Sequence, residues 1–172
     1  MGKNLMKTLF RFLTVMLTAL LLASCCQMGH NESGNNSADS HKAEIGRFLD
    51  DWHIAASRTD MQAYFDKIDE KGIYIGTDAT ENWTKQAFYD WSKPYFDEGK
   101  AWSFQAEERN IYLSEDQKMA WFDEKLSSAS GPLRGSGVLI YRNRQWKILH
   151  YVLSLPVPNE KFKAVLEVIG GE

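Results

Sequence analysis

The C-terminal stretch from Leu133 to Asn159, LRGSGVLIYRNRQWKILHYVLSLPVPN, constrains the fold more than any other part of the sequence. Two runs rich in Val, Ile, Leu, Tyr and Trp flank a polar turn at Asn143-Arg144, which predicts a β-hairpin. In regular alternation, the second run has two apolar faces, with Trp146, Ile148 and Val152 on one and Leu149, Tyr151 and Leu153 on the other. Because a strand covered on both faces cannot be a solvated edge, we expect this hairpin at the centre of a curved antiparallel sheet.

Length, charge and cysteine content narrow the class of protein. The 172 residues suffice for one domain with additional segments. A net charge of −3 gives no indication of a nucleic-acid partner. The two cysteines, Cys25 and Cys26, are adjacent and close to the N-terminus, so the sequence predicts no disulfide and no thiolate metal site in the domain that follows. Six tryptophans favour a pocket or an interface in addition to a core.

The N-terminal segment predicts export and lipid attachment. A basic stretch with Lys3, Lys7 and Arg11 precedes an apolar run over residues 12–22, which is short for a membrane span. The run ends in Leu22-Ala23-Ser24-Cys25, which resembles the bacterial lipobox. The resemblance implies a signal peptide over residues 1–24, acylation of Cys25 and anchoring to a membrane of the bacterial cell envelope, outside the cytoplasm. Ordinary secretory cleavage that leaves free thiols is the alternative.

A flexible tether is expected after the lipidated cysteine. Residues 27–41 are rich in Ser, Asn, Gly and Asp and contain almost no large apolar side chain, so they cannot bury enough surface to fold. We therefore assign residues 25–42 to the lipidated cysteine and tether, and residues 43–172 to the folded domain.

The folded domain reads as helices followed by strands. Residues 43–58 have apolar side chains at helical spacing, which predicts a helix. His53 falls on the inward side of that helix. It is either a hydrogen-bonded core residue or a polar group that faces a cavity. A short helix, a strand at residues 73–75, a polar loop and a helix over residues 84–97 follow. Four long strands, beginning near Trp102, and a helix over residues 161–169 complete the domain. This order predicts an α+β fold with the helices on one side of a bent antiparallel sheet.

The domain is similar to the nuclear transport factor 2 superfamily, in particular its SnoaL-like branch, which includes relatives of the ketosteroid isomerases. The similarity lies in five segments: Asp51 to His53, Gly76 to Glu81, Trp121 to Glu124, Arg134 to Leu139, and Trp146 to Ile148 with Leu153-Ser154 and Pro158-Asn159. It implies a conical pocket between the helices and the concave sheet, and a homodimer formed through the sheet. Members include isomerases, cyclases, dehydratases and binding domains without catalysis, so the fold does not settle the function.

The isomerase pattern suggests catalytic candidates. It implies a carboxylate base just after the first strand, where Asp78 is the nearest match, and an acid on a later strand, for which Asp123 is the counterpart. Where those enzymes have a tyrosine in the first helix, this sequence has His53, and His150 is a further candidate. Alternatively, Asp78, like Glu81, caps backbone amides, and Asp123 forms an ion pair with Arg134.

The hairpin register decides which side chains face the pocket. With a two-residue turn, residues 142 and 145 pair, and His150 shares a face with Gly135 and Gly137, which leave space in front of it. Arg134 then lies on the opposite face with Tyr151. A three-residue turn would bring Arg134 and His150 together instead. We prefer the two-residue turn.

The expected function is the binding of a small apolar or amphipathic ligand, or of an envelope protein, by a membrane-anchored homodimer. The candidate ligand-binding residues are Tyr74, Trp83, Trp102, Trp121 and Arg134. The sequence contains none of the spacings typical of metal or phosphate sites, so we expect no cofactor. The alternatives are an isomerase, dehydratase or cyclase that uses a pocket Asp/His pair, and a structural domain whose cavity its own side chains fill.

Overall fold

The computed structural model describes residues 37–170. The chain divides into two units, Met1–Ser40 and His41–Glu172. Of the first unit, residues 37–40 are described and are helical; the description below concerns the second unit. The expected signal peptide, Cys25 and most of the expected tether lie outside the described residues. In the described part of the chain, the helices are too short or too polar to cross a membrane.

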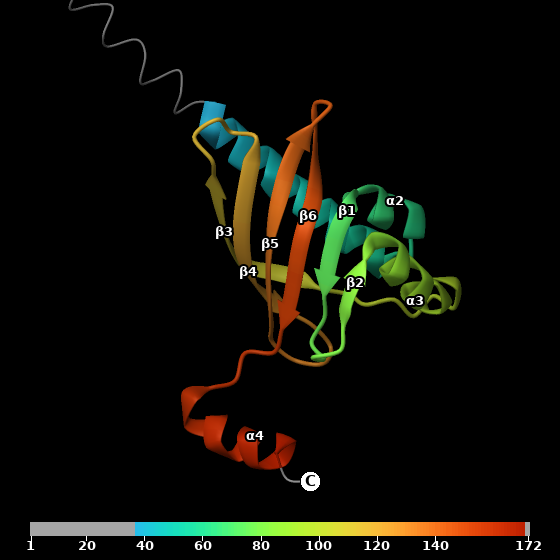
Figure 1. The fold of residues 1–172 in the computed structure, drawn as a ribbon, viewed down its shortest axis with the longest axis vertical. Helices are drawn as coiled ribbons and strands as arrows, with labels where there is room; N and C mark the ends of the chain where they lie inside the picture. Colours follow the sequence, from blue (N-terminus) through green and yellow to red (C-terminus); the bar gives the residue numbers. More distant parts are fainter. Residues whose placement is uncertain (1–36, 171–172) are drawn as a thin grey trace, which may run out of the picture. The chain divides into compact units, whose positions relative to one another are not determined.

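Helices come first and long strands later, as the sequence predicts. The first helix covers residues 41–57 of this unit. It is followed by α2 (Met61–Asp66), β1 (Ile68–Ile75), β2 (Asn82–Thr84) and α3 (Lys85–Asp97). Four long strands come next: β3 (Gln105–Leu113), β4 (Met119–Ser127), β5 (Leu133–Arg142) and β6 (Gln145–Ser154) (Figure 1). A short 3-10 turn, η1 (Asn159–Lys161), leads into α4 (Phe162–Ile169).

Side-chain caps fix the starts of α2 and α3. Asp60 accepts a hydrogen bond from the backbone N–H of Ala63, and Thr84 accepts one from Ala87, which agrees with the predicted start of a helix at residue 84. Pro94 lies inside α3 without ending it. Several boundaries differ from the prediction. Residues 37–42, assigned to the tether, are helical, and β2 forms within the expected loop. β1 begins at Ile68 rather than at residue 73, and the first long strand begins at Gln105 rather than near Trp102.

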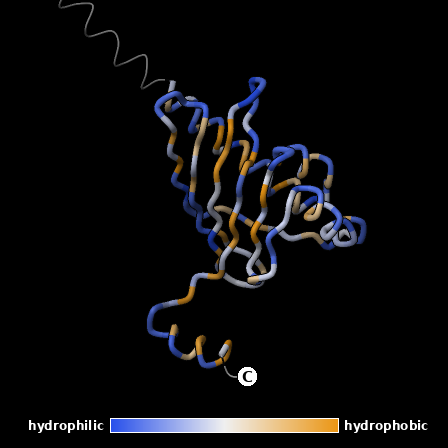
Figure 2. Tube along the Cα trace, in the orientation of Figure 1, coloured by the Kyte–Doolittle hydropathy of each residue, from blue (hydrophilic) through white to orange (hydrophobic). Residues whose placement is uncertain are grey.

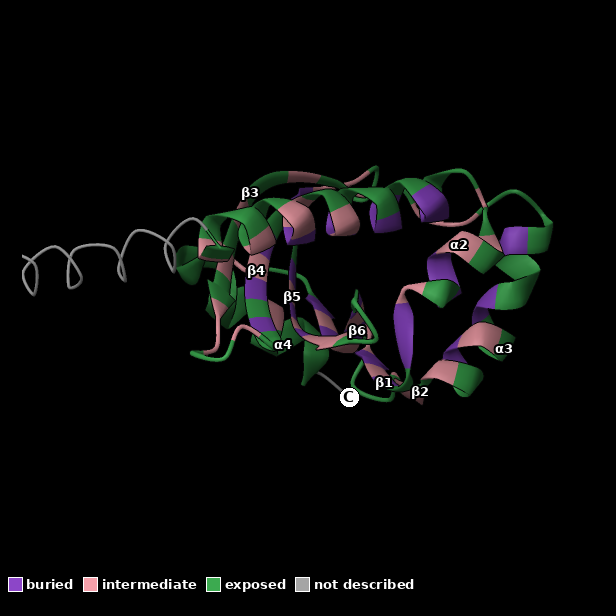
Figure 3. Cartoon of the chain, turned by 90° about the horizontal axis from the view of Figure 1, so that it is seen from above, coloured by how far each residue is buried: buried purple, intermediate pink, exposed green. Residues whose placement is uncertain are grey.

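The six strands form one sheet in the order β2-β1-β6-β5-β4-β3. Figure 3 shows the first helix, α2 and α3 on one side of this sheet, which confirms the α+β class and the curved, open sheet. One pairing differs from the purely antiparallel expectation, because β1 pairs with β6 in parallel. The long stretch of chain between these two strands allows a parallel crossover, which a short turn could not provide.

The β5–β6 hairpin has the predicted two-residue turn. Arg142 pairs with Gln145, and Asn143 and Arg144 have positive φ values of 53° and 62°, as a tight hairpin turn requires. Beyond the turn the register shifts, because His150 pairs with Val138 and Ile148 with Leu139, which leaves Leu149 as an extra residue.

This bulge changes which residues of β6 share a face. Trp146, Ile148, Tyr151 and Leu153 are buried toward the helices. The expectation that His150 faces Gly135 and Gly137 was therefore wrong, because those glycines pair with Leu153 and Tyr151. His150 lies on the outer face of the sheet, as does Arg134. We had expected these two side chains to share a face only with a three-residue turn.

The core lies between the helices and the inner face of the sheet. Its largest fully buried side chains include Trp52, Tyr64, Phe88 and Tyr151. Figure 2 shows apolar residues along the central strands and again in α4. Packed aromatic rings fill much of the space that a hollow cone would enclose, and the remaining space is divided among separate pockets.

Candidate functional site

A buried carboxylate, Glu124 on β4, lies at the centre of a polar cluster inside the fold. Its side chain is fully buried, with 0% exposed. Oε1 accepts a hydrogen bond from His53 Nε2 at 2.8 Å, and the Tyr151 hydroxyl donates to the same oxygen at 3.4 Å. Oε2 accepts a hydrogen bond from Arg109 Nε at 2.8 Å. These partners come from the first helix, β6 and β3, so the fold itself assembles the cluster.

The cluster keeps Glu124 ionised at neutral pH. Burial by itself raises the pKa of this carboxyl group, but the hydrogen bond from His53 and the positive charge of Arg109 outweigh it and hold the pKa below its ordinary value. Burial, and next the charge of Glu124, raise the pKa of the Tyr151 hydroxyl well above its usual range. Tyr151 therefore remains a neutral hydrogen-bond donor to a carboxylate.

Gly135 on β5 leaves the space that this arrangement needs. A Cβ atom at this position would overlap the Tyr151 hydroxyl and press against Glu124 Oε1. The glycine therefore lets the tyrosine reach the carboxylate across the sheet.

Arg109 connects the cluster to the first helix. Its Nη1 donates to the carbonyl oxygen of Gly46 at 2.9 Å and to Asp50 Oδ1 at 2.8 Å. Its Nη2 is buried without a hydrogen-bond partner among the described residues. One guanidinium group on β3 thus joins the neighbouring strand β4 to the first helix, which is far from both in the sequence.

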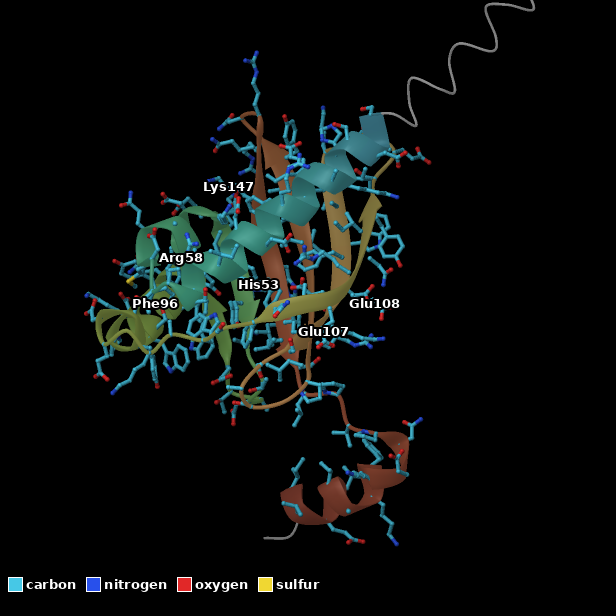
Figure 4. All side chains as sticks on the ribbon, turned by 180° about the vertical axis from the view of Figure 1, so that it is seen from behind. His53, Arg58, Phe96, Glu107, Glu108 and Lys147 are labelled. Atoms are coloured by element: carbon cyan, nitrogen blue, oxygen red, sulfur yellow. The ribbon has the colours of Figure 1, made fainter. Side chains whose placement is uncertain are left out.

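A pocket of about 370 Å³ opens beside His53. Its lining residues are Asp50, His53, Ile54, Phe104, Gln105 and Ala106. Figure 4 shows His53 where the first helix crosses the strands. Since Nε2 is bound to Glu124 and the described residues offer Nδ1 no hydrogen-bond partner, the imidazole ring has one nitrogen available to a guest.

A second pocket, of about 160 Å³, is lined mainly by aromatic side chains; we call it the aromatic pocket. It lies between β1, β2, α3 and the segment that precedes β3, and Phe104 lines both this pocket and the one beside His53. Its lining residues are Tyr74, Gly76, Thr77, Glu81, Trp83, Phe88, Trp91, Trp102, Phe104 and Leu153.

The predicted ligand-binding residues divide between two places. Tyr74, Trp83 and Trp102 line the aromatic pocket. Trp121 and Arg134 lie on the outer face of the sheet, where Trp121 is 49% exposed and stacks against Tyr112.

Of the four predicted catalytic residues, only His53 belongs to the buried cluster. Asp78 is exposed, and its Oδ1 accepts hydrogen bonds from the N–H and hydroxyl of Thr80, which lower its pKa. Asp123 lies on the outer face near Asn110, opposite Ser136 rather than Arg134. His150 lies on that same face, between Val138 and Ile73. The structure does not bring these three together with His53.

Three members of the cluster were missed from the sequence. Glu124 and Arg109 were given no role, and Tyr151 was expected on the opposite face of the sheet with Arg134. The alternation of β4 contained a usable signal, because Phe122, Glu124 and Leu126 share the inner face. In the described residues no group of three His, Cys, Asp or Glu side chains is placed to hold a metal ion.

Comparisons with known proteins identify a family and the fold. A model of the SnoaL-like domain family matches residues 45–158. A search among curated proteins found no match. The fold is similar to that of an NTF2-like protein of unknown function from Pseudomonas putida, with a TM-score of 0.60 and 13% identity over 72% of this chain and 92% of that one.

Two further structures show the same fold. An NTF2-like protein from Cytophaga hutchinsonii aligns with a TM-score of 0.57 and 12% identity, over 67% of this chain and 98% of that one. The association domain of C. elegans CaMKII aligns with a TM-score of 0.58 and 16% identity, over 70% of this chain and 99% of that one. At these identities the similarity concerns the fold alone.

Proposed function

This chain belongs to the SnoaL-like domain family, and we propose that it is a binding domain for a small apolar or amphipathic ligand, anchored to the bacterial cell envelope through Cys25. The observation that carries the proposal is the aromatic pocket. Three residues named from the sequence, Tyr74, Trp83 and Trp102, line it together, and Trp91 extends it toward solvent with 41% of its surface exposed. Aromatic walls with a few polar groups are typical of small-molecule sites.

The binding proposal is tested by what the protein retains. We expect the purified full chain, exposed to an extract of its host cells, to keep a small molecule that native mass spectrometry detects. Trp83→Leu should lose that molecule because it removes a wall of the pocket, whereas Trp121→Leu on the outer face should keep it. A chain that retains nothing, together with unchanged tryptophan fluorescence in the extract, would overturn the proposal.

The anchoring proposal rests on the lipobox-like segment and is tested at Cys25. We expect metabolic labelling with a fatty-acid analogue to mark the wild-type chain and the Cys26→Ser variant but not Cys25→Ser. The Cys25→Ser variant should leave the membrane fraction. Labelling that survives Cys25→Ser would overturn the lipid anchor.

We also propose a homodimer formed through the outer face of the sheet. A row of cross-strand partners crosses this face: Tyr112, Trp121, Val138, His150 and Ile73. Its aromatic end, the stacked pair Tyr112 and Trp121, is nearly half exposed, and neighbouring exposed aromatic rings favour an interaction surface. A two-fold contact would cover the same row on both copies.

Proton transfer is a second candidate function, favoured by the His53–Glu124 hydrogen bond. An ionised Glu124 that accepts from Nε2 would stabilise His53 as Nδ1 takes a proton from a carbon next to a carbonyl group. Such a step belongs to an isomerase, dehydratase or cyclase. We expect deuterium exchange into a panel of cyclic ketones in heavy water, with loss of that exchange in His53→Gln; exchange no faster than in buffer would exclude this candidate.

A further inference from the structure

The aromatic pocket has an unusual charge pattern for a site of its size. Six of its lining residues are aromatic: Tyr74, Trp83, Phe88, Trp91, Trp102 and Phe104. Glu81 is the one charged residue among the described residues that line it. A neutral apolar guest would not need this carboxylate, and an anion would be repelled by it.

The aromatic rings are arranged as walls. The ring centroids of Trp83 and Trp91 are 4.8 Å apart at 30°, and those of Phe88 and Trp102 are 5.6 Å apart at 23°. Rings stacked at these distances leave no room between them, so a guest in the pocket would meet the faces and edges that the stacking leaves uncovered. The face of an indole ring carries the negative part of its quadrupole and attracts cations.

The loop between β1 and β2 holds Glu81 at the pocket. Glu81 Oε2 accepts a hydrogen bond from the backbone N–H of Asp78 at 3.2 Å, and the Gly76 N–H donates to the Glu81 carbonyl oxygen at 3.0 Å. A Cβ at residue 76 would collide with the Glu81 carboxylate, so Gly76 allows that side chain to fold over the loop. The negative charge of Glu81 also acts on the pocket wall, because it is the second cause, after burial, of the raised pKa of Tyr74.

We propose that the aromatic pocket binds a compact organic cation, such as a quaternary ammonium group, with Glu81 as its counter-ion; this rests on the proposed binding function. The aromatic walls attract the positive charge while contacting the alkyl groups, and the carboxylate selects the charged guest over a neutral one of the same shape. A volume of about 160 Å³ suits such a headgroup better than a fused-ring ligand.

Another pocket provides an internal contrast. A space of about 420 Å³ beside the β5–β6 turn is lined by three basic residues, Lys67, Arg144 and Lys147, in addition to Glu44 and Asp66. Because its three basic residues outnumber its two carboxylates, this lining is less favourable to a small cation than that of the aromatic pocket. The two sites therefore differ in the sign of the guest that they favour.

The test compares choline with 3,3-dimethylbutan-1-ol, which has the same shape without the charge. With the full chain in detergent, calorimetry and tryptophan fluorescence should show choline binding about tenfold or more tightly than the alcohol. Glu81→Gln preserves the side-chain shape and an oxygen acceptor for Asp78. It should weaken choline binding by about tenfold and leave the alcohol unchanged.

A matched control separates the local charge from the net charge. Glu115→Gln also removes one negative charge, but from the exposed turn between β3 and β4, and should leave choline binding unchanged. If the alcohol binds as tightly as choline and Glu81→Gln has no effect, the cation proposal is wrong while the binding function stands. If the pocket takes neither probe and nothing is retained from the extract, both are wrong.

Discussion

At the residue scale, Glu124 shows how one position organises several distant ones. The carboxylate has no exposed surface, yet it stays charged because two donors and a cation surround it. Its neighbour Asp123 has the same chemistry but projects from the other face of β4. The sequence analysis chose Asp123 because the family resemblance implies an acid on a later strand, and it did not use the alternation of β4, which places Glu124 with Phe122 and Leu126 on the inner face.

Removing the Glu124 carboxylate should be costly. We expect Glu124→Leu to lower the free energy of unfolding by about 3–5 kcal/mol, because the buried Arg109 and His53 lose their partner. Urea unfolding followed by circular dichroism measures this. Glu108→Gln, an exposed change on the neighbouring strand, serves as the control and should barely move the midpoint. A stable Glu124→Leu variant would mean that the cluster contributes little to stability.

The same residue should make stability depend on pH. Its pKa in the folded state is below the ordinary value of 4.5. The unfolded chain therefore takes up the proton first as the pH falls, and stability declines from about pH 5 downward. We expect the free energy of unfolding of Glu124→Gln to fall less steeply than that of the wild type between pH 6 and pH 3. Parallel curves for the two proteins would contradict this linkage.

At the element scale, the β5–β6 hairpin separates what the sequence predicts from what it does not. The two-residue turn at Asn143-Arg144 was predictable from its polar residues between apolar runs. The bulge at Leu149 was not, because a β-bulge needs only one extra residue and that residue is an ordinary leucine. Its effect is large, since it moves Tyr151 to the inner face and His150 to the outer face.

Two glycines in different elements should respond oppositely to alanine. Gly135→Ala should destabilise the domain by about 1–3 kcal/mol, because the new Cβ overlaps the Tyr151 hydroxyl. Gly46→Ala in the first helix meets nothing within 4 Å and should stabilise it by about 0.5–1 kcal/mol. Thermal unfolding of the two variants measures both effects. Equal shifts of the same sign would refute the packing argument.

At the scale of the whole molecule, the two faces of the sheet have different roles. The inner face packs against the helices and forms the pockets, and the outer face carries the exposed row that ends in Tyr112 and Trp121. The fold class was predictable because helices precede strands in the sequence. The pockets were harder to predict, because the apolar periodicity of a sequence does not show how far aromatic rings fill the space between helices and sheet.

The proposed dimer should depend on that outer row. We expect the wild-type chain to sediment as a dimer at micromolar concentration and Trp121→Asp to sediment as a monomer, because the change would bury an unpaired carboxylate in the contact of each copy. Leu155→Asp changes an equally exposed apolar residue after β6 and should remain dimeric. A monomeric wild type would rule out the outer-face dimer.

The guanidinium of Arg109 links Gly46 and Asp50 on the first helix with Glu124 on β4. If residues 41–57 moved away from the sheet, Arg109 would lose its hydrogen bonds to the helix and Glu124 would lose its hydrogen bond from His53, so separating the helix from these strands breaks the buried cluster. The first helix, β3 and β4 should therefore exchange their amide hydrogens as one cooperative unit, although residues 58–104 separate the helix from these strands in the sequence.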